Sequence, residues 1–290
     1  MCTRYIIHIL NHNYNPGPIL ECLTHQITSR AENIKIILWD DGSDPSYRNA
    51  FPGLQSKYRH AFITWQLKKI NTGRAAMRQK ILEHTQDGWM ISIDSDMMPD
   101  TDFIDRMISS LQDTGTVYTG YHYYQDDAPA DDYLLHWNYG RRREVLAQKK
   151  DPYLHFSTGI YAIHASLTNN LYFDDSIQTY GHEDTLFGLL LQEKKIPVRI
   201  TSIKALHQGL STNDEFITKQ LESARNLKVV LSHYPAYKSH LIQWAQRIDK
   251  LPGATKWLSK GWVRQWCIKS LHRNPDGLIY LDVMKLNELM

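Results

Sequence analysis

The first hundred residues alternate between short apolar runs and amphipathic stretches. Four runs rich in isoleucine and aromatic residues have the composition of buried strands, namely residues 5–10, 34–39, 62–67 and 89–93. Helical patterns lie between these runs, at 19–28 and 75–84. Because strands that alternate with helices form βα units, this order predicts an α/β fold with a mostly parallel sheet flanked by helices.

The rest of the chain predicts a completion of this domain and then a helical appendage. Strand patterns at 160–164 and 198–203 enclose a helical pattern at 183–193, whereas 118–143 lacks periodicity and is expected to be a long loop near the site. From about residue 213 the pattern is helical to the end of the sequence. We therefore expect a main domain at 1–212 and a helical C-terminal region at 213–290.

Charge and cysteine content argue against two classes of protein. A net charge of +2 gives no electrostatic case for a nucleic-acid binder. Cys2, Cys22 and Cys267 are too far apart for zinc-ligand spacing, and so few cysteines suit a reducing compartment.

The short apolar N-terminus is expected to be a strand rather than a signal peptide. No apolar run approaches the roughly 20 residues that span a bilayer, so we expect a cytoplasmic protein.

Two carboxylates follow the strand predicted at 89–93, in the segment Asp94-Ser95-Asp96. Side chains two residues apart on a strand leave the same face, and parallel sheets bind ligands beyond the carboxyl ends of their strands. Paired carboxylates suit Mg²⁺ or Mn²⁺, which prefer oxygen ligands and bridge to phosphates. The alternative is that both aspartates only cap the turn that Met97-Met98-Pro99-Asp100 forms.

Two further segments have the composition of ligand contacts near strand ends. Asp40-Asp41-Gly42-Ser43 ends the second strand, where a carboxylate can accept a hydrogen bond from a base or ribose and Gly42 permits a tight turn. Residues 71–78, Asn-Thr-Gly-Arg-Ala-Ala-Met-Arg, start a helix whose free N–H groups can face an anion. Each segment is equally compatible with an ordinary turn or with close packing of a helix on the sheet.

Glu183 and Asp184 lie in the first turn of the helix predicted at 183–193, after Gly181-His182. The helix dipole favours the ionised form of a carboxylate there, and a general base must be ionised. Helix capping alone is the alternative. His207 follows the late strand, and this position makes it a candidate third metal ligand among the fourteen histidines.

The order of these motifs resembles the inverting glycosyltransferases of family 2, which have the GT-A fold. DDGS, NxGxxxxR, DSD, GHED and the histidine follow one another within about residues 4–215. The segment FDDSIQTYGHEDTLFGLLLQEKK is similar to the acceptor-side stretch of that family. The resemblance implies a nucleotide-sugar half at about 1–100 and an acceptor half at about 101–212.

The resemblance also implies a role for each matching residue. Asp41 would contact the nucleotide base, expected to be uracil, and His12 stands where the family often places an aromatic residue near that base. Arg78 would help to hold the nucleotide. Asp94 would lie near the ribose and Asp96 on the metal, with Ser95 between them in the donor site.

On the acceptor side, Asp184 would be the general base and Glu183 would face a sugar, while His207 would contact the metal or the diphosphate. The implied reaction is a direct displacement, in which Asp184 deprotonates an acceptor hydroxyl that attacks the anomeric carbon and inverts it. The expected donor is a UDP-sugar, and the expected acceptor is a hydroxyl of a glycan or of a lipid-linked acceptor, as in polysaccharide biosynthesis.

The C-terminal region contains a basic, tryptophan-rich helical pattern. Lys256, Lys260 and Arg264 recur every four residues, and tryptophans lie among them. Such a helix can lie in a membrane interface, so peripheral contact with the inner face of a membrane through 254–273 is one expectation. Packing of the tryptophans against the main domain or a partner subunit is the other.

Three other functions are compatible with part of this pattern. An aspartate-based phosphohydrolase also uses a strand-ending DxD, but it leaves DDGS and GHED unexplained. A sugar nucleotidyltransferase would need a Gly-rich, Arg-containing loop after the first strand, which the sequence lacks. A non-catalytic nucleotide-sugar binding protein would not need both Asp96 and Asp184.

Overall fold

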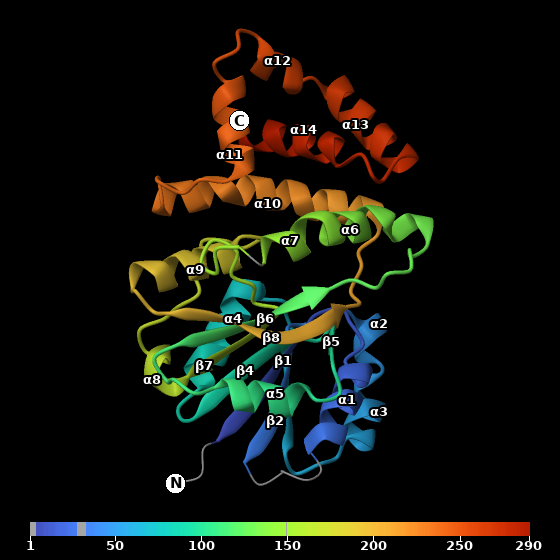
Figure 1. Cartoon of the computed structure of the whole chain (residues 1–290). Helices are drawn as coiled ribbons and strands as arrows, with labels where there is room; N and C mark the ends of the chain where they lie inside the picture. Colours follow the sequence, from blue (N-terminus) through green and yellow to red (C-terminus); the bar gives the residue numbers. More distant parts are fainter. Residues whose placement is uncertain (1–3, 28–32, 149) are drawn as a thin grey trace. The chain divides into compact units, whose positions relative to one another are not determined.

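The computed structural model describes residues 4–27, 33–148 and 150–290 (Figure 1). Cys2 and the predicted helix end at Thr28 lie outside these residues. The chain forms two compact units, each of which is described by itself. The first comprises Met1–Gln125, Val145–Asp175 and Asp184–Gly209, and the second comprises Asp126–Glu144, Ser176–Glu183 and Leu210–Met290.

An eight-stranded sheet forms the first unit, with the strand order β3-β2-β1-β4-β7-β6-β8-β5. The strands are β1 (Tyr5–Asn11), β2 (Ile34–Asp40), β3 (Ile63–Leu67), β4 (Trp89–Asp94), β5 (Met97–Pro99), β6 (Val117–Tyr123), β7 (Ile160–His164) and β8 (Val198–His207). The first four strands pair in parallel, as predicted. β7 pairs antiparallel with β4 and β6, and β5 with β8, so the sheet as a whole is mixed.

Two strands were not predicted, and both lie near the site. β5 is only three residues long, and the prediction treated it as a turn. The prediction assigned β6 to a long loop, because its tyrosines and His122 obscure the alternation of apolar and polar residues that is typical of a strand. The remainder of that expected loop is a 3-10 turn (Asp131–Tyr133), the helix α6 (Leu134–Tyr139) and a π-helical turn (Gly140–Glu144), so the loop expectation was wrong.

The apolar residues of β1 alternate between two cores, one on each face of the sheet. Ile7 and Ile9 pack in the core that receives α1 (Gly17–Ile27) and α5 (Phe103–Ser110). Ile6 and Leu10 pack in the core that receives α4 (Arg74–His84) and α9 (Glu183–Glu193). Because successive side chains of a strand point to opposite faces, one apolar strand contributes to both layers.

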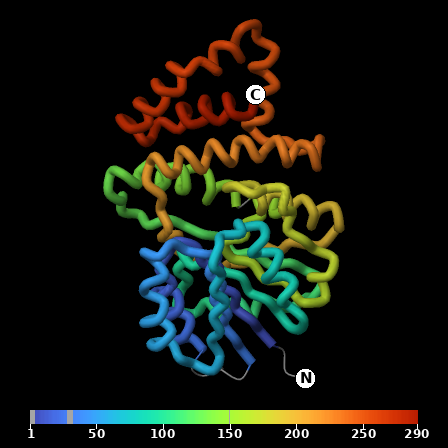
Figure 2. Tube along the Cα trace, turned by 180° about the vertical axis from the view of Figure 1, so that it is seen from behind, coloured from blue at the N-terminus to red at the C-terminus, as the bar shows by residue number. Residues whose placement is uncertain are grey.

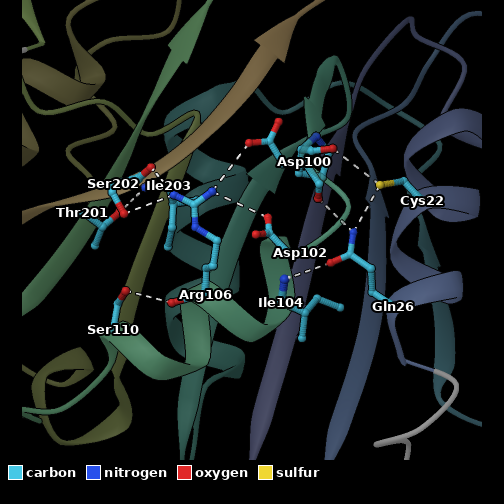
Figure 3. A network of polar contacts seen from close by, with 11 residues as sticks. Cys22, Gln26, Asp100, Asp102, Ile104, Arg106, Ser110, Thr201, Ser202 and Ile203 are labelled. Carbon is cyan, nitrogen blue, oxygen red and sulfur yellow. Dashed lines mark hydrogen bonds and ion pairs between the residues drawn. The ribbon is translucent and has the colours of Figure 1, made fainter.

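A polar network supports the segment that follows β5 (Figure 3). Gln26 of α1 donates to the carbonyl oxygen of Asp100 at 3.1 Å and accepts from the backbone N–H of Ile104 at 2.9 Å. Arg106 of α5 donates to the carbonyl oxygen of Ser202 in β8 at 2.7 Å. Through these hydrogen bonds, α1, α5 and β8 fix the position of the segment at 100–106, which follows Asp96 and β5.

The second unit is helical, as predicted from residue 213 onward (Figure 2). Its helices include α10 (Asn213–His233), α11 (His240–Ile248), α12 (Ala254–Leu258), α13 (Gly261–Arg273) and α14 (Leu278–Leu289). A core with Phe216, Leu221, Val263, Cys267 and Leu281 joins α10, α13 and α14. The helix predicted at 254–273 is divided into α12 and α13 at Ser259-Lys260.

Segments 126–144 and 176–183, predicted within the main domain, belong to this helical unit instead. Arg143 forms an ion pair with Asp282 of α14, and Arg142 forms one with Asp276 at 3.1 Å. Among the described residues, no helix is long and apolar enough to cross a membrane.

Candidate active site

The polar residues at the ends of β1 and β2 are joined by hydrogen bonds. Asn11 donates to Asp40 at 2.9 Å, and the backbone N–H of Ser43 donates to the other oxygen of Asp40 at 3.1 Å. Asn11 and Asp40 are opposite each other in the parallel register. All three side chains are buried, so they fix the geometry of the strand ends.

Asp41 binds the loop that precedes α4. Its Oδ1 accepts from the backbone N–H of Thr72 at 3.0 Å and from Thr72 Oγ1 at 2.8 Å, and its Oδ2 accepts from the N–H of Gly73 at 2.9 Å. Gly42 has φ +68°, and a Cβ there would lie 2.4 Å from the backbone N of Asn71. The glycine therefore permits the close approach of the loop that Asp41 holds.

His12 joins the same loop from the end of β1. Its Nδ1 lies 3.1 Å from the carbonyl oxygen of Asp41, and its Nε2 lies 3.1 Å from Nδ2 of Asn71. The ring is exposed. His12, Asp41 and the loop at 71–73 thus form one surface.

The carboxylate of Asp94 forms an ion pair with the buried side chain of Arg78. Nη2 of Arg78 lies 2.9 Å from Oδ1 and 3.0 Å from Oδ2 of Asp94. The Arg78 side chain is 1% exposed and that of Asp94 is 16% exposed. Any effect of Arg78 on a nucleotide must therefore pass through Asp94. Ser95 is buried, and its N–H donates to the carbonyl oxygen of Leu10 at 2.9 Å.

Asp96 lies beside His207 because of the pairing of β5 with β8. Met97, the residue after Asp96, is opposite His207 in the antiparallel register. Oδ2 of Asp96 lies 3.4 Å from Nε2 of His207, and the N–H of Gln208 donates to the carbonyl oxygen of Asp96 at 2.9 Å. A Cβ at Gly209 would lie 2.3 Å from Oδ2 of Asp96, so only glycine fits there.

Charges around Asp96 favour its ionised form. Burial by itself would raise the pKa of this carboxyl, but His207 and then Arg74 outweigh the burial and hold the pKa well below its ordinary value. Burial, and second the charge of Asp96, raise the pKa of Tyr14. Tyr14 and Arg74 therefore lie in the electrostatic environment of Asp96.

Asp96 also has the donor chemistry of a metal ligand. Its Oδ1 is buried and has no hydrogen-bond partner among the described residues. A buried carboxylate oxygen without a partner is costly unless something else binds it. An ionised oxygen beside an imidazole nitrogen suits Mn²⁺ or Mg²⁺, so Asp96 and His207 fit the metal that the sequence predicted.

The other face of His207 is fixed by aromatic residues of the first unit. Nδ1 of His207 lies 2.9 Å from the hydroxyl of Tyr124. The rings of His122 and His207 are 5.5 Å apart, centroid to centroid. A partner on Nδ1 sets the ring orientation and the tautomer, which leaves Nε2 directed at Asp96.

The acidic pair lies in the first turn of α9. Glu183 is buried, and Asp184 Oδ1 accepts from the backbone N–H of Thr185 at 2.7 Å. His182, the residue before the pair, has φ +73°, a conformation that non-glycine residues rarely adopt. Glu183 is assigned to the second unit and Asp184 to the first.

The structure thus brings the predicted residues into pairs: His12 with Asp41, Arg78 with Asp94, and Asp96 with His207. Sequence reasoning missed Tyr14, Arg74 and Tyr124. Arg74 was visible in the helix-start segment but was not singled out. Tyr124 follows an unpredicted strand, so nothing in the sequence connected it with His207.

A family model described as "Glycosyl transferase family 2" matches residues 6–175 of the chain, more than half of its length. Asp184 and His207 lie beyond the matched range. No curated protein matches the sequence.

Solved structures resemble the chain at low identity. A Pyrobaculum calidifontis mannosyltransferase, PcManGT in complex with GDP-Man and Mn²⁺, aligns at TM-score 0.61 and 12% identity over 100% of this chain and 88% of its own. TarS 1–349 of S. aureus with UDP-GlcNAc aligns at 0.53 and 13%, covering 98% and 90%. GalNAc-T7 with UDP, GalNAc and Mn²⁺ aligns at 0.53 and 12%, covering 79% and 48%. The likeness shows a GT-A type fold.

Proposed function

Because the chain belongs to glycosyl transferase family 2 and is a glycosyltransferase, we propose that it moves a sugar from a nucleotide-diphosphate donor to an acceptor hydroxyl with inversion. The acceptor we propose is a glycan or a lipid-linked glycan. The observation that carries this proposal is the Asp96–His207 pair, with a buried carboxylate oxygen that has no partner among the described side chains. The family match favours a transferase over a phosphohydrolase or a nucleotidyltransferase.

Asp96 and His207 would hold Mn²⁺ or Mg²⁺. A bound divalent cation neutralises charge on the departing diphosphate and so makes it a better leaving group. Arg74 is exposed at the start of α4 and acts electrostatically on Asp96, so it would contact the same diphosphate. Tyr124 would keep Nε2 of His207 available through its contact with Nδ1.

The nucleoside would bind on the surface that His12 and the loop at 71–73 form together. Both oxygens of Asp41 already accept hydrogen bonds from that loop, so Asp41 would act on the base chiefly by fixing Thr72 and Gly73. Asp94 and Ser95 would face the ribose, with Arg78 fixing Asp94. We propose UDP as the nucleotide. PcManGT was solved with GDP-Man, which makes GDP the alternative to test.

Asp184 would be the general base. Its place in the first helical turn favours the ionised carboxylate. The carboxylate takes the proton of the acceptor hydroxyl, and the hydroxyl oxygen forms a bond to the anomeric carbon. The bond from that carbon to the diphosphate breaks on the opposite face, so an α-linked donor gives a β-glycoside and free nucleoside diphosphate.

A thermal-shift screen of UDP- and GDP-sugars with and without Mn²⁺ tests the donor class. Ligand at about 100 times its Kd stabilises a protein by about 2.7 kcal/mol, enough for a shift of several degrees. We expect a shift that needs both donor and metal. Absence of any shift with every donor in the presence of Mn²⁺ would contradict the proposal.

Asp184→Asn tests the base. General-base catalysis contributes about 100- to 10,000-fold, so transfer should fall by that order while the donor-induced thermal shift persists. Transfer at the wild-type rate would remove Asp184 from the mechanism. The anomeric configuration of the product, measured by the proton coupling in NMR, tests inversion separately.

A further inference from the structure

Three exposed tryptophans lie on α12 and α13 of the second unit. Trp257, Trp262 and Trp266 are 46%, 55% and 50% exposed. The ring of Trp257 meets that of Trp262 edge-on at 5.7 Å between centroids, and Trp266 meets Tyr280 of α14 at 5.0 Å. We call these three tryptophans the aromatic band.

The tryptophans of the aromatic band are not part of the apolar core of the second unit. Val263, Cys267 and Leu271 recur every four residues on α13 and are buried in that core. Trp262 and Trp266 each precede one of these residues, and neighbouring helix positions point about 100° apart. Their exposed faces therefore contribute little to folding, and large exposed apolar side chains in a group indicate a binding surface.

The segment that contains the aromatic band is rich in positive charge. Residues 247–273 contain one acidic side chain, Asp249, and seven basic ones: Arg247, Lys250, Lys256, Lys260, Arg264, Lys269 and Arg273. The segment has a net charge of +6, whereas the whole chain has +2. Lys256, Lys260 and Lys269 are exposed and form no ion pair with any described residue. Arg264 pairs with Glu288 at 3.6 Å.

We propose that the aromatic band and its lysines bind the headgroup region of an anionic lipid bilayer. Tryptophan rings favour the interface between water and lipid, and lysines close to anionic headgroups add attraction. Protein interfaces enrich tryptophan but deplete lysine, so three exposed tryptophans and three exposed lysines within one segment favour a membrane over a protein partner. The attachment is peripheral, and its test does not rely on the proposed reaction.

Co-sedimentation of the full-length protein with phosphatidylcholine vesicles, with and without phosphatidylglycerol, tests the surface. We expect binding only to the anionic vesicles and a loss of binding as salt increases. Trp262→Ser with Trp266→Ser should weaken binding by at least about tenfold, because both rings leave the interface. Trp244→Ser on α11 is the matched control, since Trp244 is exposed at 38% but lies outside the band.

A pair of charge-reversal substitutions tests the contribution of the lysines separately from that of the tryptophans. Lys256→Glu with Lys260→Glu should abolish binding to anionic vesicles, whereas Lys228→Glu with Lys238→Glu, exposed lysines outside the segment, should leave it unchanged. The unfolding midpoint of each variant shows whether it is folded. Failure of the wild type to bind anionic vesicles at low salt, or equal binding by both lysine pairs, would overturn the proposal. Binding to pure phosphatidylcholine at the same affinity would also contradict it.

Discussion

Asp41 follows β2 and Asp96 follows β4, and each is one of a pair of aspartates at a strand end. Both oxygens of Asp41 accept hydrogen bonds from the backbone of the loop at 72–73. At Asp96, one oxygen lies near His207 and the other is buried without a partner among the described residues. The same residue type at the same kind of position thus has both oxygens bonded to backbone N–H groups in one case and a buried oxygen without a partner among the described residues in the other.

The two partner aspartates, in contrast, are both held by other groups of the protein. Asp40 accepts from Asn11 and Ser43, and Asp94 is paired with the buried guanidinium of Arg78. A carboxylate at a strand end becomes a candidate ligand only where the surrounding chain leaves an oxygen unsatisfied. Substitutions at the two strand ends should therefore have different effects on stability and on metal binding.

Arg78→Met should have the largest effect, on stability. Removing one member of a buried ion pair leaves an uncompensated charge and costs about 3–5 kcal/mol of the free energy of unfolding. Chemical denaturation with circular dichroism measures the change. The double variant with Asp94→Asn should recover part of the loss, and a double variant that is as unstable as the sum of the singles would show that the pair does not interact.

Asp96→Asn should reduce metal-dependent transfer by at least about 100-fold, because a metal ligand and its negative charge are lost. Calorimetry should show weakened Mn²⁺ binding to the protein without any donor. Asp87→Asn, at a surface pair with Arg4, is the control and should change neither quantity. Unaltered Mn²⁺ affinity in Asp96→Asn would remove Asp96 from the metal site.

Asp41→Asn should lower the free energy of unfolding by about 1–3 kcal/mol. The NH₂ group of the asparagine would face a backbone N–H that now donates a hydrogen bond to the carboxylate of Asp41, so that bond would be lost. Mn²⁺ affinity should stay at the wild-type value, in contrast to Asp96→Asn. Comparison of the two variants by denaturation and by calorimetry tests the distinction directly. Equal losses of metal affinity would show that the two strand ends do not have separate roles.

Tyr124→Phe should have the smallest effect, a loss of about tenfold in Mn²⁺ affinity, since a residue that orients a metal ligand typically contributes 10- to 100-fold. Phenylalanine keeps the ring contact with His207 at 5.3 Å between centroids and removes only the hydroxyl. Calorimetry should show the loss, while the unfolding midpoint changes little. Tyr123→Phe is the matched control on the neighbouring residue.

Much of the architecture was predictable because the relevant signals are local. The parallel strands at β1 to β4 are continuous apolar runs, and the C-terminal helices are periodic and interrupted by prolines. β5 and β6 were missed, since one is only three residues long and the other has a mixed polar and aromatic sequence. The antiparallel pairings of β5 with β8 and of β6 with β7 were therefore missed, although β7 and β8 themselves were predicted as strands.

The sequence by itself determined which residues stand at the strand ends, and their order was enough to indicate the family. Tertiary structure decided what each of them contacts. Arg78 lies beneath Asp94 because α4 packs on the sheet, and His207 meets Asp96 because Met97 is its partner in the antiparallel register. The physical reason is that hydrogen bonding and charge depend on distances between residues that are separated in the chain, by 16 positions for Arg78 and Asp94 and by 111 for Asp96 and His207. Those distances exist only once the sheet has formed.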